Sequence, residues 1–204
     1  MKKYIFFSFL TLALLFASCQ KDPDTDKLYD DYLVLTNYDS STDFKDLSTF
    51  YVIDSILIID NKEKPTYWKN DNSKKIINAY NENFTARGYT QAANSDVADM
   101  VFQLSYINTT YYFNNSTGPW WNSYPGYWNW GGWGWYYPFT FYYAYSTGAI
   151  VGELVDTRTP RADNKLPVVW NSYICGLLTG GNLSYSRTMK AINQAFEQSP
   201  YLSK

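Results

Sequence analysis

Alternating apolar and polar residues along the chain predict a set of β-strands. Strands are expected over residues 32–38, 49–53, 99–113, 148–156 and 166–177. Residues 56–59 either extend the second strand or pair with it. In the last strand, Val168, Trp170 and Ile174 share one face, so we expect the Trp170 ring to lie in the core.

Two further segments carry apolar residues at helical spacing. The first runs from Ser73 to Arg87, with capping residues before it and Gly88 at its C-terminal end. The second runs from Ser184 to Gln198 and stops before Pro200. The order of strands, helix, strands and helix predicts an α+β fold, with two helices packed on one face of an antiparallel β-sheet.

The first 18 residues have the pattern of a signal peptide. Lys2 and Lys3 precede a short apolar run, which ends at Cys19 and is followed by polar residues. The run is shorter than the roughly 20 apolar residues that a transmembrane helix needs. A cysteine directly after the small residues Ala17 and Ser18 matches a bacterial lipobox, in which the thiol receives a diacylglycerol. We therefore expect lipidation of Cys19, with an ordinary secretory signal as the alternative.

This leader divides the chain into three parts. Residues 1–18 are the expected lipoprotein signal peptide, and residues 19–30 the lipidated cysteine with a flexible tether. Residues 31–204 form a single domain. The expected location is the cell envelope, anchored in the outer membrane by the N-terminal lipid, with the periplasmic or surface face left open. The acidic residues after Cys19 fit a solvated linker and a surface-export signal equally well.

Composition narrows the function classes. The chain has 17 basic and 19 acidic residues, and removal of the leader takes away Lys2 and Lys3. The remaining net charge is about −4, so nucleic acid is not an expected partner. The chain has no histidine, the commonest general base and metal ligand. We expect no catalytic residue, metal or cofactor, and therefore no enzyme. A hydrolase that uses carboxylates alone remains open. Asp156, beside Arg158 and Arg161, is interpreted as part of a surface ion pair.

An aromatic-rich hairpin or loop insertion is expected over about residues 114–138. No charged residue lies between Asp99 and Glu153, and six of the eight tryptophans lie between Trp120 and Trp135. Glycine and proline disfavour a long helix here. The candidates for ligand or partner contact are Trp120, Trp121, Tyr124, Tyr127, Trp128, Trp130, Trp133 and Trp135.

Four interpretations of this aromatic insertion stay open. Tryptophan and tyrosine are favoured anchors at protein interfaces. They also stack on sugars and suit membrane interfaces, with Asn122 and Asn129 as the amides offered to a glycan. The insertion could instead fold over the domain's own surface. We expect a non-enzymatic envelope protein that contacts a protein partner through the insertion, with a surface glycan-binding lipoprotein as the alternative.

Short motifs in the chain match a known family. They are Ala86-Arg87-Gly88-Tyr89 after the first helix, Ala98-Asp99-Met100-Val101, Leu154-Val155-Asp156, Val168-Val169-Trp170, and a last helix ending in Phe196 and Pro200. With these motifs, residues 32–202 resemble the domain-of-unknown-function 4136 family of bacterial envelope lipoproteins. The resemblance implies the fold and the location and implies no activity. Members often carry a basic residue and a glycine after the tryptophan, where this chain has Asn171 and Ser172.

Overall fold

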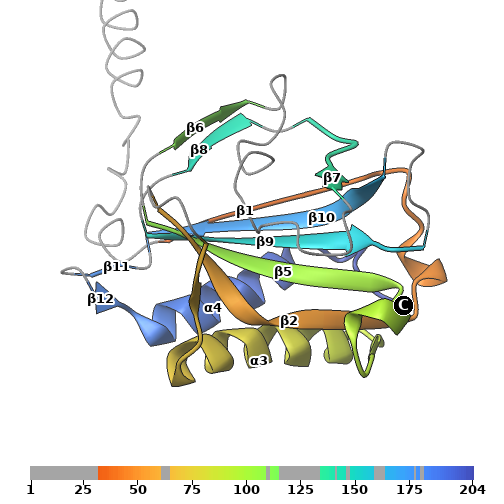
Figure 1. Ribbon diagram of the computed structural model, residues 1–204, viewed down its shortest axis with the longest axis horizontal. Coiled ribbons are helices and arrows are strands. Elements are labelled where there is room, and N and C mark those ends of the chain that lie inside the picture. Colours follow the sequence, from red (N-terminus) through yellow and green to blue (C-terminus); the bar gives the residue numbers. More distant parts are fainter. Residues whose placement is uncertain are drawn as a thin grey trace, which may run out of the picture. The chain divides into compact units, whose positions relative to one another are not determined.

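The computed structural model in Figure 1 describes most of the expected domain. The described residues are 32–60, 65–108, 111–114, 134–140, 142–145, 148–158, 164–176, 178–179 and 182–204. They belong to a compact unit that spans Tyr32–Lys204. The expected signal peptide and tether lie outside the described residues.

Within the described part of the chain, eight strands form one sheet. They are β1 (Leu33–Tyr38), β2 (Thr49–Ile59), β3 (Thr66–Trp68), β4 (Thr90–Gln91), β5 (Met100–Ile107), β7 (Gly134–Tyr136), β9 (Ala149–Asp156) and β10 (Lys165–Cys175). The order is β1-β10-β9-β5-β2-β3, with β4 beside β2 and β7 beside β10. Two separate strand pairs are β6 (Tyr111–Asn114) with β8 (Tyr142–Tyr145), and β11 (Leu178–Thr179) with β12 (Asn182–Leu183).

The helices are α3 (Asp71–Ala86) and α4 (Tyr185–Glu197), accompanied by the short 3-10 turns η1 (Phe44–Asp46) and η2 (Ser95–Val97). Both helices lie on the same side of the sheet (Figure 1), where their apolar residues join one core with the strands. The α+β class and the two helices on one face are therefore confirmed. No helix in the described ranges is both long and apolar enough to cross a membrane.

The sheet is mixed, and the expectation of a wholly antiparallel sheet is wrong. Strands β1, β10, β9 and β5 are antiparallel neighbours, but β2 runs parallel to β5. A parallel pair needs a crossover connection, which α3 provides between β2 and β5. Residues 49–53 and 56–59 form the single strand β2, whose register against β5 shifts between Val52 and Ile56. The strand expected over residues 99–113 divides into β5 and β6.

Local signals explain where the helices begin and end. The side chain of Asn70 accepts hydrogen bonds from the amides of Asn72 and Ser73, both at 3.0 Å, so it caps α3. Gly88 follows α3 with φ of +92°, which confirms the expected C-terminal glycine. At the same end, the Arg87 guanidinium donates to the carbonyls of Phe196 and Ser199, the latter at 2.9 Å. Arg87 therefore joins the C-terminal ends of the two helices.

The core between the helices and the sheet is rich in aromatic rings. Trp170 is 0% exposed, which confirms that it is a core residue. Val168, expected on the same face, instead lies in an apolar cluster on the other face, because the strand register shifts between Val168 and Trp170. The indole N–H of Trp170 donates to the Ser199 hydroxyl at 2.9 Å, and the rings of Phe102 and Phe196 pack against it. Gly152 lies in the same layer, where an added Cβ would come within 2.3 Å of Phe102 Cζ. Only glycine therefore fits at position 152, because the Phe102 ring occupies the space that a larger side chain would need.

The opposite face of the sheet, called here the second face, carries a separate apolar cluster. Its buried members are Leu57, Ile59, Ile107, Trp135, Ala149, Val151, Val155, Leu166, Val168 and Tyr173. Tyr137 and Phe139 are partly buried and pack against this cluster. Both come from residues 134–140, called the strap below, so the strap covers part of the second face.

Candidate functional site

Most of the residues expected to make contacts lie outside the described residues. This holds for Cys19 and for Trp120, Trp121, Tyr124, Tyr127, Trp128, Trp130 and Trp133. Trp135 is described and lies in β7, where it is only 2% exposed. The expectation that Trp135 offers an exposed contact does not match this position, because its ring is part of the core of the second face.

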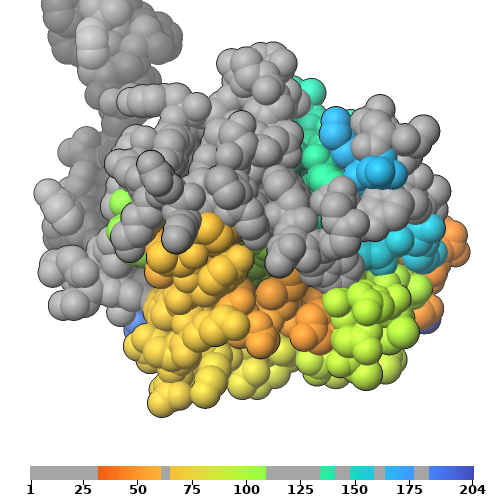
Figure 2. Space-filling model, viewed as in Figure 1, coloured from red at the N-terminus to blue at the C-terminus, as the bar shows by residue number. Residues whose placement is uncertain are grey.

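Backbone pairing explains the burial of Trp135. Strand β7 runs parallel to the first residues of β10, with Trp135 opposite Leu166. The Gly134 amide also donates to the Asn164 carbonyl at 2.8 Å. Figure 2 shows the strap, in green, beside the blue start of β10. Three residues of regular pairing thus fix the C-terminal end of the aromatic insertion to the sheet and turn Trp135 inward.

Beneath the strap, a row of polar side chains crosses the second face. Gln103, Glu153 and Asn171 are direct neighbours on β5, β9 and β10, and Asn37 on β1 is paired with Asn171. The Asn37 amide donates to the Asn171 side-chain oxygen at 3.3 Å. Glu153 is 1% exposed, and its carboxyl oxygen accepts a hydrogen bond from the Tyr137 hydroxyl. We call these four side chains the polar row.

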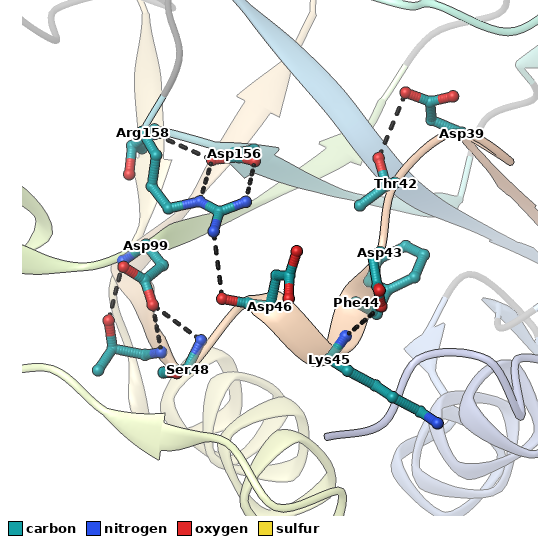
Figure 3. Close-up of polar contacts among 12 residues, drawn as sticks. Asp39, Thr42, Asp43, Phe44, Lys45, Asp46, Ser48, Asp99, Asp156 and Arg158 are labelled. Atoms are coloured by element: carbon teal, nitrogen blue, oxygen red, sulfur yellow. Dashed lines mark hydrogen bonds and ion pairs between the residues drawn. The ribbon is translucent and has the colours of Figure 1, made fainter.

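A second polar cluster lies at one end of the sheet (Figure 3) and centres on Arg158. The guanidinium forms an ion pair with Asp156 at 2.9 Å and donates to the Asp46 backbone carbonyl at 3.1 Å. The expected pairing of Asp156 with Arg158 is present, but Asp156 is buried rather than at the surface. Arg161, the other expected partner, lies outside the described residues.

Asp99 belongs to the same end of the sheet and holds the start of β2. Its carboxylate accepts the amide hydrogens of Ser48 and Thr49 at 2.8 Å and 3.0 Å. Burial by itself raises the pKa of Asp99, but these hydrogen bonds, the Thr49 hydroxyl and the charge of Arg158 together lower that pKa below its usual range. Asp99 therefore stays ionised and serves as a structural acceptor.

The side chains of these two clusters hold neighbouring parts of the domain together. The acidic side chains Asp99, Asp156 and Glu153 each accept hydrogen bonds from neighbouring parts of the domain. Among the described residues, no group of three or more histidine, cysteine or acidic side chains is placed to hold a metal ion. The arrangement orders backbone and side chains.

Sequence reasoning missed the polar row. Its one signal is a lone glutamate in an otherwise apolar strand, Val151-Gly152-Glu153-Leu154-Val155. A glutamate is almost never fully buried unless it has a partner, so this position could have been marked as partnered. The partners themselves depend on the register of β5, β9 and β10, which local patterns do not give.

Comparison with known proteins identifies relatives of the domain. A family model described as a domain of unknown function (DUF4136) matches residues 34–201. The crystal structure of a DUF4136 family protein from Bacteroides thetaiotaomicron is 46% identical, with 85% of this chain and 98% of that chain covered and a TM-score of 0.75. A search of curated proteins gave no significant match.

Two other solved structures are much less similar. The PelC dodecamer from Paraburkholderia phytofirmans is 12% identical over 85% of this chain and 99% of that chain, with a TM-score of 0.41. A PDZ domain protein from Parabacteroides distasonis is 13% identical over 88% of this chain and 40% of that chain, also with a TM-score of 0.41. The family model and the Bacteroides thetaiotaomicron structure decide the assignment: the chain belongs to the DUF4136 family.

Proposed function

We propose that the protein is a non-enzymatic, lipid-anchored cell-envelope protein that binds another envelope protein through its aromatic insertion. The observation that carries this proposal is the pairing of the strands on either side of the insertion. The chain enters it from β6, which pairs with β8 in a separate two-stranded sheet, and leaves it through β7, which pairs with β10 in the eight-stranded sheet. The uncharged residues 115–133 therefore follow one paired strand and precede another, and β7 joins their C-terminal end to the domain.

The composition of residues 115–133 supports a contact role. Large aromatic side chains contribute most of the binding energy at many protein interfaces, because they bury much area with little loss of side-chain entropy. The absence of charge favours a partner surface that is itself largely apolar. Trp135 is buried in the core of the second face, so the contact surface is assigned to the rings from Trp120 to Trp133.

The use of the acidic side chains supports a non-enzymatic role. A carboxylate-only hydrolase needs two carboxyl groups that face each other across a substrate. In the domain, Asp99 binds the amides of Ser48 and Thr49, and Asp156 binds Arg158. Glu153 accepts from Tyr137 beneath the strap. Each group is therefore engaged in holding the fold.

The leader supports the anchor. Cys19 follows Ala17 and Ser18, as a lipidated cysteine does, and the domain begins near Tyr32. An extended chain spans at most about 3.5 Å per residue, so the intervening residues can reach roughly 40 Å from the bilayer. A domain held in this way can meet partners in or near the membrane.

The decisive experiment replaces residues 116–132 with a short Gly/Ser linker and retains β7. We expect the thermal midpoint to change little, because the strap and the core cluster remain. Crosslinking in intact cells, followed by purification, should then lose a partner that the unmodified protein captures. A matched control replaces Trp120, Trp128 and Trp133 by phenylalanine, which keeps aromatic area and should retain part of the capture.

Two outcomes would contradict the contact proposal. Unfolding of the linker variant would show that the rings belong to the domain's own core. Unchanged capture would remove the insertion from the interface. Quenching of tryptophan fluorescence by added oligosaccharides, present in the full-length protein and lost in the linker variant, would assign the insertion to glycan instead.

The anchor is tested separately. A Cys19→Ala variant should lose metabolic palmitate label and leave the membrane fraction. Cys175→Ala is the matched control, because it removes the other cysteine and leaves the leader intact. Label and sedimentation that persist in Cys19→Ala would overturn the lipoprotein proposal.

A further inference from the structure

The polar row lies in an unusual place for polar side chains. On one side of it are Val151 and Tyr173, and on the other are Val155 and Val168, all buried in the cluster of the second face. Burying a carboxyl group in such surroundings is costly unless it is hydrogen-bonded. A polar partner from above the sheet therefore stabilises the row.

The strap supplies that partner. Within the strap, Trp135 contacts the apolar cluster, and Tyr137 places its hydroxyl on the Glu153 carboxyl oxygen. The rings of Tyr137 and Phe139 pack edge to face, with centroids 5.4 Å apart. Trp135 and Tyr137 are two residues apart, the spacing at which side chains point to the same side of an extended chain. One of them makes the apolar contact with the sheet and the other makes the polar contact.

Two amide side chains flank the acceptor. Gln103 and Asn171 stand directly opposite Glu153 on its two neighbouring strands, and both are buried. Side-chain amides carry donors as well as acceptors, so they are suited to surround a carboxyl group. The amide of Asn37 in turn donates to Asn171, which extends the row to the edge strand β1.

We propose that the hydrogen bond from Tyr137 to Glu153 is a fastening point that, together with the pairing of β7 with β10, sets where the strap rests on the sheet. The backbone pairing ends at Tyr136, and beyond it apolar contacts alone tolerate sliding, whereas a buried polar group is satisfied in only one position. Because the strap continues directly from the aromatic insertion, this fastening point fixes the position of one end of the insertion. The biological meaning of this hydrogen bond rests on the proposed function, because it would position the segment that contacts the partner.

Hydrogen exchange on the isolated protein tests the proposal. Tyr137→Phe removes only the hydroxyl and keeps the ring. We expect amide exchange in residues 134–137 to accelerate by about tenfold or more, as for the loss of a buried hydrogen bond. Exchange in α3 and β5 should stay unchanged. Tyr51→Phe, which removes the hydroxyl of a half-buried tyrosine on β2, is the matched control and should leave the strap protected.

A double variant decides whether the two groups act together. Glu153→Met keeps the length of the side chain and removes the acceptor oxygens, so it should accelerate exchange in the strap to a similar degree. The combination of Glu153→Met and Tyr137→Phe should add little to either single change. Independent, multiplying effects would overturn the proposal, as would unchanged protection in Tyr137→Phe or a uniform acceleration across the whole domain. Because no partner is present, these results are independent of the capture experiment.

Discussion

The two faces of the sheet are built by different rules. On the helix side, rings of Phe84, Phe102 and Trp170 fill one continuous core. The polar groups there meet in twos and threes, such as Tyr80 with Ser172 at 3.3 Å, and Ser199 with Trp170 and Tyr201. On the second face, a buried carboxyl and three amides cross four strands beneath an irregular strap.

This difference assigns a separate task to each face. Apolar packing between regular elements is fixed by shape and supplies most of the stability. Only three residues of the strap pair with the sheet, so pairing and shape position the rest of it weakly. A buried polar row requires one matching arrangement, and it therefore helps to specify where the strap lies. The helix side holds the fold, and the second face holds the segment that we assign to contacts.

The largest effect should come from emptying the helix-side core. Trp170→Ala removes a fully buried ring and its hydrogen bond to Ser199, and we expect it to lower the free energy of unfolding by about 3–5 kcal/mol. Urea unfolding followed by circular dichroism measures this. Trp135→Ala is the matched change on the second face. It should cost less, because the strap can detach while the sheet stays folded. Equal losses would contradict the division between the faces.

Overfilling the same core should have the next largest effect. Gly152→Ala places a Cβ within 2.3 Å of Phe102 and 2.8 Å of the Ser172 hydroxyl, so the surrounding side chains must move. We expect a loss of about 1–3 kcal/mol in the free energy of unfolding. Gly134→Ala in the strap is the control, because its nearest contact, Lys165 Cγ, is at an ordinary 3.4 Å. A tolerated Gly152→Ala would show that the helix-side core is less tightly packed than described.

These contrasts also explain what the sequence could reveal. Trp170 was predicted in the core because its strand alternates, and Gly88 was predicted at a helix end because few other residues adopt its conformation. The parallel pairing of β2 with β5 was missed because periodicity reports faces and not strand neighbours. Within the insertion, composition treats every tryptophan alike. Trp135 is placed in the core by the pairing of β7 with residues 165–167, a tertiary contact without a local signal.

A smaller loss of stability is expected from changing Arg87, which joins the C-terminal ends of α3 and α4. Arg87 donates to the carbonyls of Phe196, Ser199 and Leu202 at the end of α4. Arg87→Lys keeps the charge and loses the planar array of donors, so we expect a loss of about 1–2 kcal/mol in the free energy of unfolding. Exchange of the last amides of α4 should accelerate first. The strap amides serve as the internal control, and their acceleration would show that the two faces are not independent.

The smallest effect should depend on pH and arise at the polar end of the sheet. The pKa of Asp99 is lower in the folded protein than in the unfolded chain, so its contribution is present above the unfolded value of about 3.9. That contribution is lost as the pH falls through the folded value. Asp99→Asn should therefore be less stable than the unmodified protein near pH 7, and the difference should shrink as the pH is lowered below about 4. Urea unfolding at a series of pH values measures the difference.

Asp54→Asn is the control, because Asp54 is an exposed acid whose ion pair with Lys69, at 3.7 Å, lies in solvent. The prediction would be contradicted if the difference in the free energy of unfolding between Asp99→Asn and the unmodified protein stayed constant down to pH 2. The hydrogen bonds from the Ser48 and Thr49 amides would then not depend on the charge of Asp99.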